Sequence, residues 1–218
     1  MSKLTIRIFP LLFLFFLAGV GQSSAQQVSA YFGVGTATDG AATSGGCAPK
    51  NVPDSTGACV AAPTIGGAFG VIGGDVMIRP HFGLNFEDSF RFAQADFLPT
   101  DGLKARQSFY DFNALYQPGS GDSRIVPVLE GGIGGGKVSI YLNQQFCATS
   151  SICSNQSQFY ISANHFQLHG AAGVKLYFKP NVFIKPQVDF HWVPNLNQQY
   201  GSNFVPQYTI AIGYTFGR

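Results

Sequence analysis

Three of the four histidines in this chain suggest a role in hydrolysis or metal binding. His165 and His169 stand four residues apart, and His191 follows later. On a strand, two residues four apart share a face but lie about 13 Å from each other, which does not suit a shared metal ion. No serine stands two residues after any of these histidines, as a histidine–serine lipid deacylase would need. We therefore predict interior hydrogen-bonding histidines, with no catalytic residue, no metal site and no cofactor.

Seven ionisable residues fall on the small, polar faces of the alternating segments described below. A charged group in a narrow, partly dry interior is costly unless it is paired. We expect these residues to form an internal network of ion pairs and hydrogen bonds that plugs the lumen of the β-barrel predicted below. A gated or conducting pore is the alternative. The seven residues are Glu87, Arg91, Asp111, Glu130, Lys175, Lys185 and Asp189.

The four cysteines form two local pairs, Cys47 with Cys59 and Cys147 with Cys153, each in a polar stretch rich in Gly or Ser. An even number of cysteines in an exported chain favours disulfides. Four cysteines allow three pairings, and pairing between neighbours keeps each bridge within one loop. We predict two structural loop disulfides in preference to a redox or metal site.

The N-terminus predicts export. Lys3 and Arg7 precede the apolar run 8–20, and the small residues of 23–25 follow it, as in a secretory signal peptide. We expect cleavage after Ala25, which leaves residues 26–218 as one domain. No later segment is continuously apolar over the roughly 20 residues that a membrane-spanning helix needs. A helical membrane protein is therefore excluded.

The composition indicates a surface that does not face water. Charged residues make up 11% of the chain, whereas soluble domains carry about 25%. Aromatic residues reach 14%, and a surface in contact with lipid removes the need for charge. The net charge of +2 gives no support for a nucleic-acid partner.

Apolar and polar residues alternate with period two along most of the chain, which predicts half-buried strands. In the last segment Tyr208, Ile210 and Ile212 share one face, and Gln207 and Thr209 lie on the other. Eight such segments can be drawn, an even number, as expected of an outer-membrane barrel. They are residues 28–36, 65–78, 83–92, 108–116, 125–142, 165–176, 182–192 and 207–216.

The connections alternate in length. Those after the second, fourth and sixth segments are short turns, at residues 79–81, 118–122 and 179–181. The others are long, at residues 37–63, 93–107, 143–158 and 194–204. Outer-membrane barrels place long loops outside the cell and short turns in the periplasm. Both cysteine pairs then fall in extracellular loops, the first and the third.

An eight-stranded barrel can also be a soluble calyx with a polar exterior. Here the polar faces consist largely of Gly, Ala, Gln, Thr and Asn, which are too small and too uncharged for a good soluble exterior. The same residues suit a narrow interior, and the aromatic faces suit lipid. The predicted fold is all-β, an eight-stranded antiparallel up-and-down transmembrane β-barrel.

The chain ends in Tyr214-Thr215-Phe216-Gly217-Arg218. With the signal peptide, the eight segments and the alternating connections, this aromatic last segment resembles the small OmpA/OmpX-like and opacity-type outer-membrane barrels. The resemblance implies that the barrel-assembly machinery reads a terminal aromatic residue, here Phe216, which two further residues follow. It also implies outer-membrane lipid as a partner.

These observations favour an integral barrel of the Gram-negative outer membrane, a structural or surface-interaction protein without a catalytic role. Its interactions with an extracellular partner would run through the first and third loops, whose small polar residues suit display. A narrow passive pore for small solutes is the second hypothesis. A lipid-modifying enzyme is the third.

Overall fold

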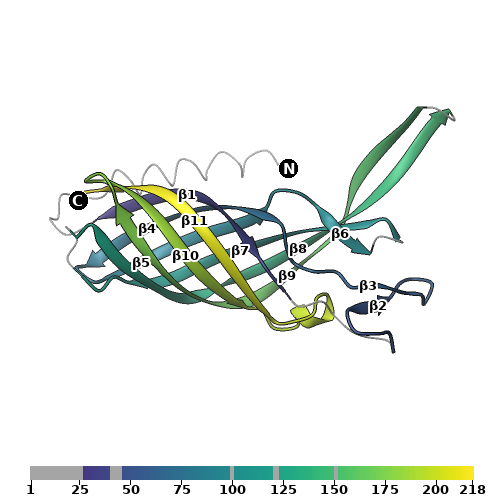
Figure 1. Cartoon of the computed structure of the whole chain (residues 1–218), viewed down its shortest axis with the longest axis horizontal. Coiled ribbons are helices and arrows are strands. Elements are labelled where there is room, and N and C mark those ends of the chain that lie inside the picture. Colours follow the sequence, from purple (N-terminus) through teal and green to yellow (C-terminus); the bar gives the residue numbers. More distant parts are fainter. Residues whose placement is uncertain (1–26, 40–45, 99–100, 120–122, 150–151) are drawn as a thin grey trace, which may run out of the picture.

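The computed structural model describes residues 27–39, 46–98, 101–119, 123–149 and 152–218. Eight strands form the wall of a closed barrel (Figure 1). The predicted signal peptide, residues 1–25, lies outside the described residues. The eight strands are β1 (Val28–Ala37), β4 (Ala68–Arg79), β5 (Phe82–Arg91), β7 (Leu103–Tyr116), β8 (Ile125–Thr149), β9 (Ile152–Tyr177), β10 (Val182–Trp192) and β11 (Phe204–Phe216).

Every wall strand pairs antiparallel with its neighbours along the chain, which is the up-and-down order. The barrel closes where β1 pairs with β11, from Val28 opposite Phe216 to Ala37 opposite Gln207. Closure satisfies the backbone groups that an open sheet would expose at its edges. The prediction of an eight-stranded antiparallel barrel is confirmed.

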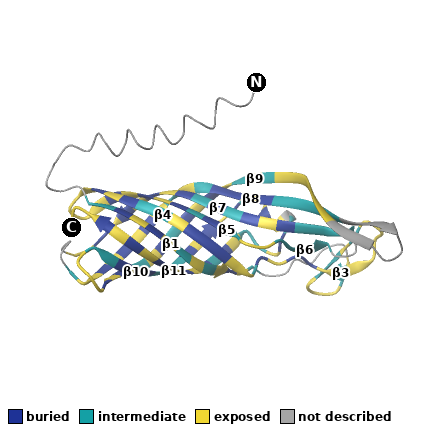
Figure 2. Cartoon of the chain, turned by 90° about the horizontal axis from the view of Figure 1, so that it is seen from above, coloured by how far each residue is buried: buried dark blue, intermediate teal, exposed yellow. Residues whose placement is uncertain are grey.

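Residues alternate between the two sides of the wall, so buried and exposed positions form a chequered pattern (Figure 2). In β11 Gln207 is fully buried and Thr209 is 9% exposed, whereas Tyr208 and Ile210 are about half exposed. Along β10, Lys185 faces inward and Ile184 faces outward in the same way. The residues that alternate with period two in the sequence therefore face the inside and the outside of the barrel in turn.

Two glycines show why small residues line the interior. A Cβ atom on Gly134 of β8 would lie 2.7 Å from Oδ1 of Asp111. A Cβ atom on Gly73 of β4 would lie 2.5 Å from Cζ of the Tyr31 ring. Eight strands enclose little space, so these positions must stay small for larger side chains to fit between them.

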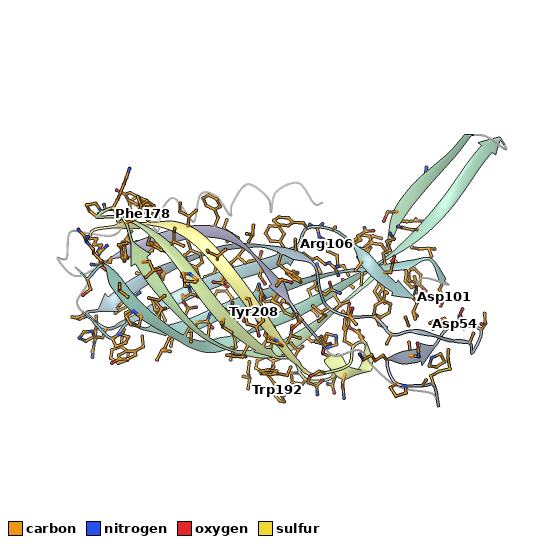
Figure 3. The ribbon with its side chains drawn as sticks, in the orientation of Figure 1. Asp54, Asp101, Arg106, Phe178, Trp192 and Tyr208 are labelled. Carbon is orange, nitrogen blue, oxygen red and sulfur yellow. A yellow bond between two sulfur atoms is a disulfide. The ribbon has the colours of Figure 1, made fainter. Side chains whose placement is uncertain are left out.

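The connections divide the barrel into a short-turn end and a long-loop end. The short turns follow β4, β7 and β9, and both termini of the barrel domain lie at that end (Figure 1). At the long-loop end, residues 193–203 include a 3₁₀ turn, η3 (Leu196–Gln198). Figure 3 places Phe178 at the short-turn end and Asp54 and Asp101 at the other. Among the described residues no helix is both long and apolar enough to cross a membrane.

The first long loop contains a small hairpin of β2 (Asn51–Pro53) and β3 (Cys59–Ala61). Cys47 and Cys59 form a disulfide with their Cα atoms 5.7 Å apart, as predicted. Asp54 closes the turn of the hairpin, because its Oδ1 accepts hydrogen bonds from the backbone N–H of Thr56 and Ala58, both at 2.9 Å.

The prediction of an irregular third loop over residues 143–158 is wrong. β8 and β9 stay paired as far as Thr149 opposite Ile152, and this hairpin projects well beyond the barrel (Figure 1). The segment lies beyond the barrel wall (Figure 1), and its sequence carries no apolar alternation to mark strands. Cys147 and Cys153 are opposite each other in this register, and their side chains lie outside the described ones.

The second loop is shorter than predicted, whereas the fourth, at residues 193–203, has the predicted length. β7 begins at Leu103 and β11 at Phe204, where the alternation predicted 108 and 207. Within the second connection, β6 (Ala95–Leu98) pairs with the start of β7. Burial still alternates in these added residues, but the inward ones, Ala105 and Val205, are apolar and pack in the cluster at the mouth of the barrel. An apolar residue on the inner side breaks the pattern of polar residues inside that the prediction followed.

Candidate functional site in the barrel lumen

The centre of the lumen is built around Lys185 of β10, which is 1% exposed. Its Nζ atom lies 2.7 Å from Oε1 of Glu130 and 3.8 Å from Oε2 of Glu87. The ammonium group also donates to the hydroxyl of Tyr31 at 3.2 Å and lies 4.3 Å from the centre of its ring. Tyr31 in turn donates to Glu87 at 2.7 Å. The ammonium group of β10 therefore contacts two carboxylates and a phenol that come from three other strands.

A pair of stacked histidines continues the network toward the long-loop end. The rings of His169 and His191 are 4.9 Å apart at 25°. Nδ1 of His169 lies 2.9 Å from Oδ1 of Asn113, and its Nε2 lies 3.3 Å from Oδ1 of Asp189. Gln187 donates to the same Asp189 oxygen at 2.5 Å and to Glu87 at 3.3 Å, which joins this group to the Lys185 centre.

Amide side chains complete this part of the network. Gln167 donates to Oδ1 of Asp111 at 2.5 Å. His191 has Gln207 beside its Nε2 at 3.1 Å, and Ser89 donates to the same Gln207 at 3.1 Å. A buried polar group without a partner costs about 1 to 3 kcal/mol, so these contacts stabilise the lumen chiefly by avoiding that cost.

A second ion pair lies nearer the short-turn end. Nζ of Lys175 is 2.6 Å and 2.9 Å from the two carboxylate oxygens of Asp75, and it donates to Ser29 at 3.2 Å. The ammonium group lies 5.0 Å from the centre of the Phe183 ring. Both charged partners are 2% exposed. This pair has one carboxylate where the Lys185 centre has two.

Apolar side chains close the lumen above the network. At the long-loop end, Tyr200 and Leu196 reach into the mouth of the barrel, and each is 1% exposed. Gln107 donates to the hydroxyl of Tyr200, and burial raises the pKa of that phenol. We call this cluster the outer plug. It comprises Ala37, Ile65, Phe69, Ala105, Phe109, Val138, Val193, Leu196, Tyr200 and Val205.

A second apolar cluster, the inner plug, lies toward the short-turn end. Phe183 is fully buried at its centre, with its ring 5.4 Å from that of Tyr177 and 6.5 Å from that of Tyr31. The inner plug comprises Tyr31, Val71, Val126, Tyr177, Phe183 and Ala211.

One group of lumen residues has donor atoms of the kind that bind metals. Single donor atoms of Asp111, His169 and His191 lie within 4.8 Å of one another. The imidazoles are already engaged, because Asn113 contacts His169 and Gln207 contacts His191. These three residues therefore belong to the hydrogen-bonded network of the lumen.

Six of the seven residues predicted for the lumen lie buried inside it. These are Glu87, Asp111, Glu130, Lys175, Lys185 and Asp189. Arg91 differs, because it lies half-buried at the long-loop end of β5 and donates to Gln107 at 3.5 Å. His165 shares the inward side near the same end, and its Nε2 is buried without a hydrogen-bond partner.

Sequence reasoning missed Asp75 and the neutral members of the network, including Tyr31 and Gln187. The sequence did indicate Asp75, because it lies an even number of residues from Val71 and Met77 in β4 and therefore on the same, inward face. Tyr31 was assigned to no role because an inward aromatic residue breaks the polar-inside pattern. The alternation of side chains along each strand would have placed Asp75 and Tyr31 inside, but only the fold shows what they contact.

No protein-family model matches the sequence, and no curated protein matches it. Several solved structures share its fold. A major outer membrane protein from Thermus thermophilus is 11% identical, with a TM-score of 0.54, covering 88% of this chain and all of that one. Neisserial surface protein A is 14% identical, with a TM-score of 0.51, covering 91% of this chain and 99% of its own. OprG from Pseudomonas aeruginosa is 14% identical, with a TM-score of 0.50, covering 90% and 98%. The chain has the fold of small outer-membrane barrels.

Proposed function

We propose that this protein is an integral β-barrel of the outer membrane that presents a stabilised surface at its long-loop end and has no catalytic role. The observation that carries this proposal is the inverted distribution of side chains. Lys185 is 1% exposed and Asp189 is fully buried, while Phe32 is 67% and Ile125 is 63% exposed. Soluble monomers rarely expose contiguous apolar surface, and lipid is the solvent that suits this exterior.

Aromatic side chains at both ends of the wall support the same proposal. Trp192 points away from the barrel at the long-loop end, beside its register partner Phe204, and Phe178 does so at the other end (Figure 3). Aromatic rings are enriched at the two interfaces between a membrane and water. The apolar band between these rings would then lie in the hydrocarbon core.

Cell fractionation tests the location directly. We expect the full-length chain, expressed with its N-terminal segment, to be recovered with outer membranes and to change mobility on a gel when boiled. A closed barrel resists the detergent until it is heated, whereas an unfolded chain migrates the same way in both lanes. Recovery in the soluble periplasm would contradict the proposal and favour a ligand-binding calyx.

The filling of the lumen supports a barrel that does not conduct. Gln167, Asp189 and Gln207 are fully buried in the middle, and the outer plug lies above them. An eight-stranded barrel is just wide enough for its own side chains. We expect no single-channel current in planar bilayers, and regular conductance steps would favour the passive pore instead.

The position of the histidines supports the absence of a lipid-modifying activity. His169 and His191 are 6% and 2% exposed, and they lie on the inner side of the wall. A lipid substrate would meet the outer side. We expect lipid A of unchanged mass after overexpression, and a shortened or substituted lipid A would establish an enzyme.

The long-loop end is organised for display. The Cys47–Cys59 disulfide holds the loop-one hairpin, and Ser55 donates to Oδ1 of Asp101 at 2.7 Å, which joins that loop to the second one. Loops positioned by a rigid scaffold commonly carry binding functions. These contacts support a role in recognising an extracellular partner.

We include in this proposal a second disulfide, between Cys147 and Cys153. Their backbone positions are directly opposite in the antiparallel register of β8 and β9. Opposite residues of such strands have Cα atoms about 4.5 to 5.5 Å apart, within the range that a disulfide spans. Peptide mapping of the unreduced protein should find this bridge, and free thiols at both positions would exclude it.

A further inference from the structure

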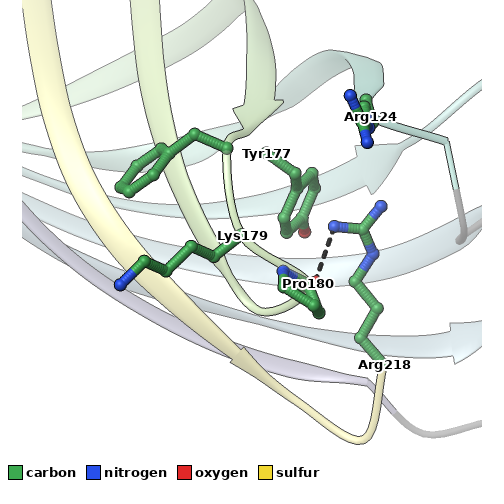
Figure 4. Close-up of a pocket in the computed structure, with 6 residues that line it drawn as sticks. Arg124, Tyr177, Lys179, Pro180 and Arg218 are labelled. Carbon is green, nitrogen blue, oxygen red and sulfur yellow. Dashed lines mark hydrogen bonds between the residues drawn. The ribbon is translucent and has the colours of Figure 1, made fainter.

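The short-turn end of the barrel contains a cavity of about 330 Å³ (Figure 4). This size is at the lower end of the range for small-ligand sites. Three of its six lining residues are basic. The lining residues are Arg124, Tyr177, Phe178, Lys179, Pro180 and Arg218.

Arg218 is held in a defined position beside this cavity. Its two terminal nitrogens donate to the carbonyl oxygens of Pro180, at 2.8 Å, and Ser123, at 2.6 Å. Its guanidinium carbon lies 3.3 Å from the centre of the Tyr177 ring. These contacts orient the guanidinium before any ligand binds.

The other two basic residues are open to solvent or lipid headgroups. Arg124 and Lys179 are both exposed. The ion pairs found in the described part of the chain involve neither of them. Several basic side chains lining one cavity favour an anionic ligand, and arginine presents its donors in a fork that matches phosphate oxygens.

The cavity begins where the apolar outer surface ends. Ile125 and Leu176 are register partners that face outward. Arg124, which precedes Ile125, and Tyr177, which follows Leu176, line the cavity. Phe178 lines the cavity and is itself 57% exposed. A ligand here would meet both basic side chains and an exposed aromatic ring, which suits an amphiphile.

We propose that this cavity binds the phosphate group of an anionic phospholipid headgroup in the periplasmic leaflet. Arg218 and Arg124 bind the phosphate oxygens, Lys179 adds positive charge, and Phe178 contacts the adjoining glycerol and acyl region. The inference goes beyond the function proposed above and rests on its membrane insertion. Attraction of a basic residue to an anionic lipid surface strengthens binding about fivefold per residue.

Native mass spectrometry of the folded full-length barrel in detergent tests the site, with equal amounts of phosphatidylglycerol and phosphatidylcholine as probes. We expect the wild type to retain phosphatidylglycerol preferentially. The variant Arg124→Gln should lose about fivefold of that preference, and Arg124→Gln with Lys179→Gln roughly 30-fold. The matched control is Arg79→Gln, which removes an exposed rim arginine that does not line the cavity.

The same experiment can overturn the proposal in three ways. A wild type without preference for phosphatidylglycerol would exclude the site. An equal loss in Arg79→Gln would show that the whole rim attracts lipid and that the cavity is not special. Retention that excess inorganic phosphate abolishes, together with calorimetric binding of inorganic phosphate alone, would assign the cavity to a free anion and not to lipid. Failure of the proposed function would appear separately, as a chain absent from outer membranes.

Discussion

The two buried lysines of the lumen lie in different surroundings. Lys185 contacts Glu130, Glu87 and Tyr31 near the middle of the barrel, whereas Lys175 contacts Asp75 and Ser29 near the short-turn end. The first is shared among several strands, and the second is almost a simple pair. The same lumen therefore contains one lysine that neutralises two carboxylates, Lys185, and one lysine that neutralises a single carboxylate, Lys175.

The largest effect is expected at the shared lysine. Lys185→Met leaves Glu130 and Glu87 buried without their common cation, and breaking a buried ion pair costs about 3 to 5 kcal/mol. We expect a loss of unfolding free energy at the upper end of that range. Urea unfolding in lipid vesicles, followed by the fluorescence of Trp192, measures it, because this is the only tryptophan.

Arg79→Met is the control for that measurement, because it removes an exposed basic residue from the short-turn end that does not line the cavity there. It should leave the unfolding midpoint near the wild-type value. If Lys185→Met behaved like this control, Lys185 would contribute nothing to the stability of the barrel.

A smaller loss is expected at the paired lysine. Lys175→Met leaves one buried carboxylate, Asp75, without its cation, and we expect a cost of about 3 kcal/mol. The same unfolding measurement applies. A loss equal to or greater than that of Lys185→Met would reverse the comparison and show that sharing of Lys185 gives it no additional importance.

Replacing both partners of the simple pair sharpens the comparison further. Asp75→Leu with Lys175→Met removes both charges and adds apolar contacts next to Phe183. Such replacements of buried pairs are often neutral, so we expect stability within about 1 kcal/mol of the wild type. If the double variant were as unstable as Lys175→Met alone, the ion pair of Lys175 and Asp75 would be needed for assembly of the lumen.

The smallest effect is expected outside the lumen. Cys47→Ser with Cys59→Ser removes the disulfide of the loop-one hairpin, which does not belong to the barrel wall. We expect the free energy of barrel unfolding to change by no more than about 0.5 kcal/mol, as for most surface substitutions. Limited proteolysis should nevertheless cut the first loop faster. A large shift in barrel unfolding would show that the loop and the lumen are coupled.

Much of this fold can be predicted from the sequence, because the alternation of side chains across a barrel wall is a local property. The predicted segment 182–192 has the bounds of β10, and the short turns fall where Pro, Gly and Asn residues predict them. The prediction failed over residues 143–158, where β8 and β9 stay paired although the sequence shows no apolar alternation. Backbone pairing holds those strands together, and backbone pairing leaves no mark on the residue types.

By itself the sequence determined the strand order, the two faces of each strand and the inward position of six ionisable residues. Only the tertiary structure decided that Lys185 meets Glu130 and Glu87, that Asp75 belongs to Lys175, and that Phe109 and Tyr200 close the mouth. The reason is that contacts across a lumen join strands far apart in the chain. They depend on the register of every intervening pair of strands, and a one-residue slip in one pair would change the partners of all the others.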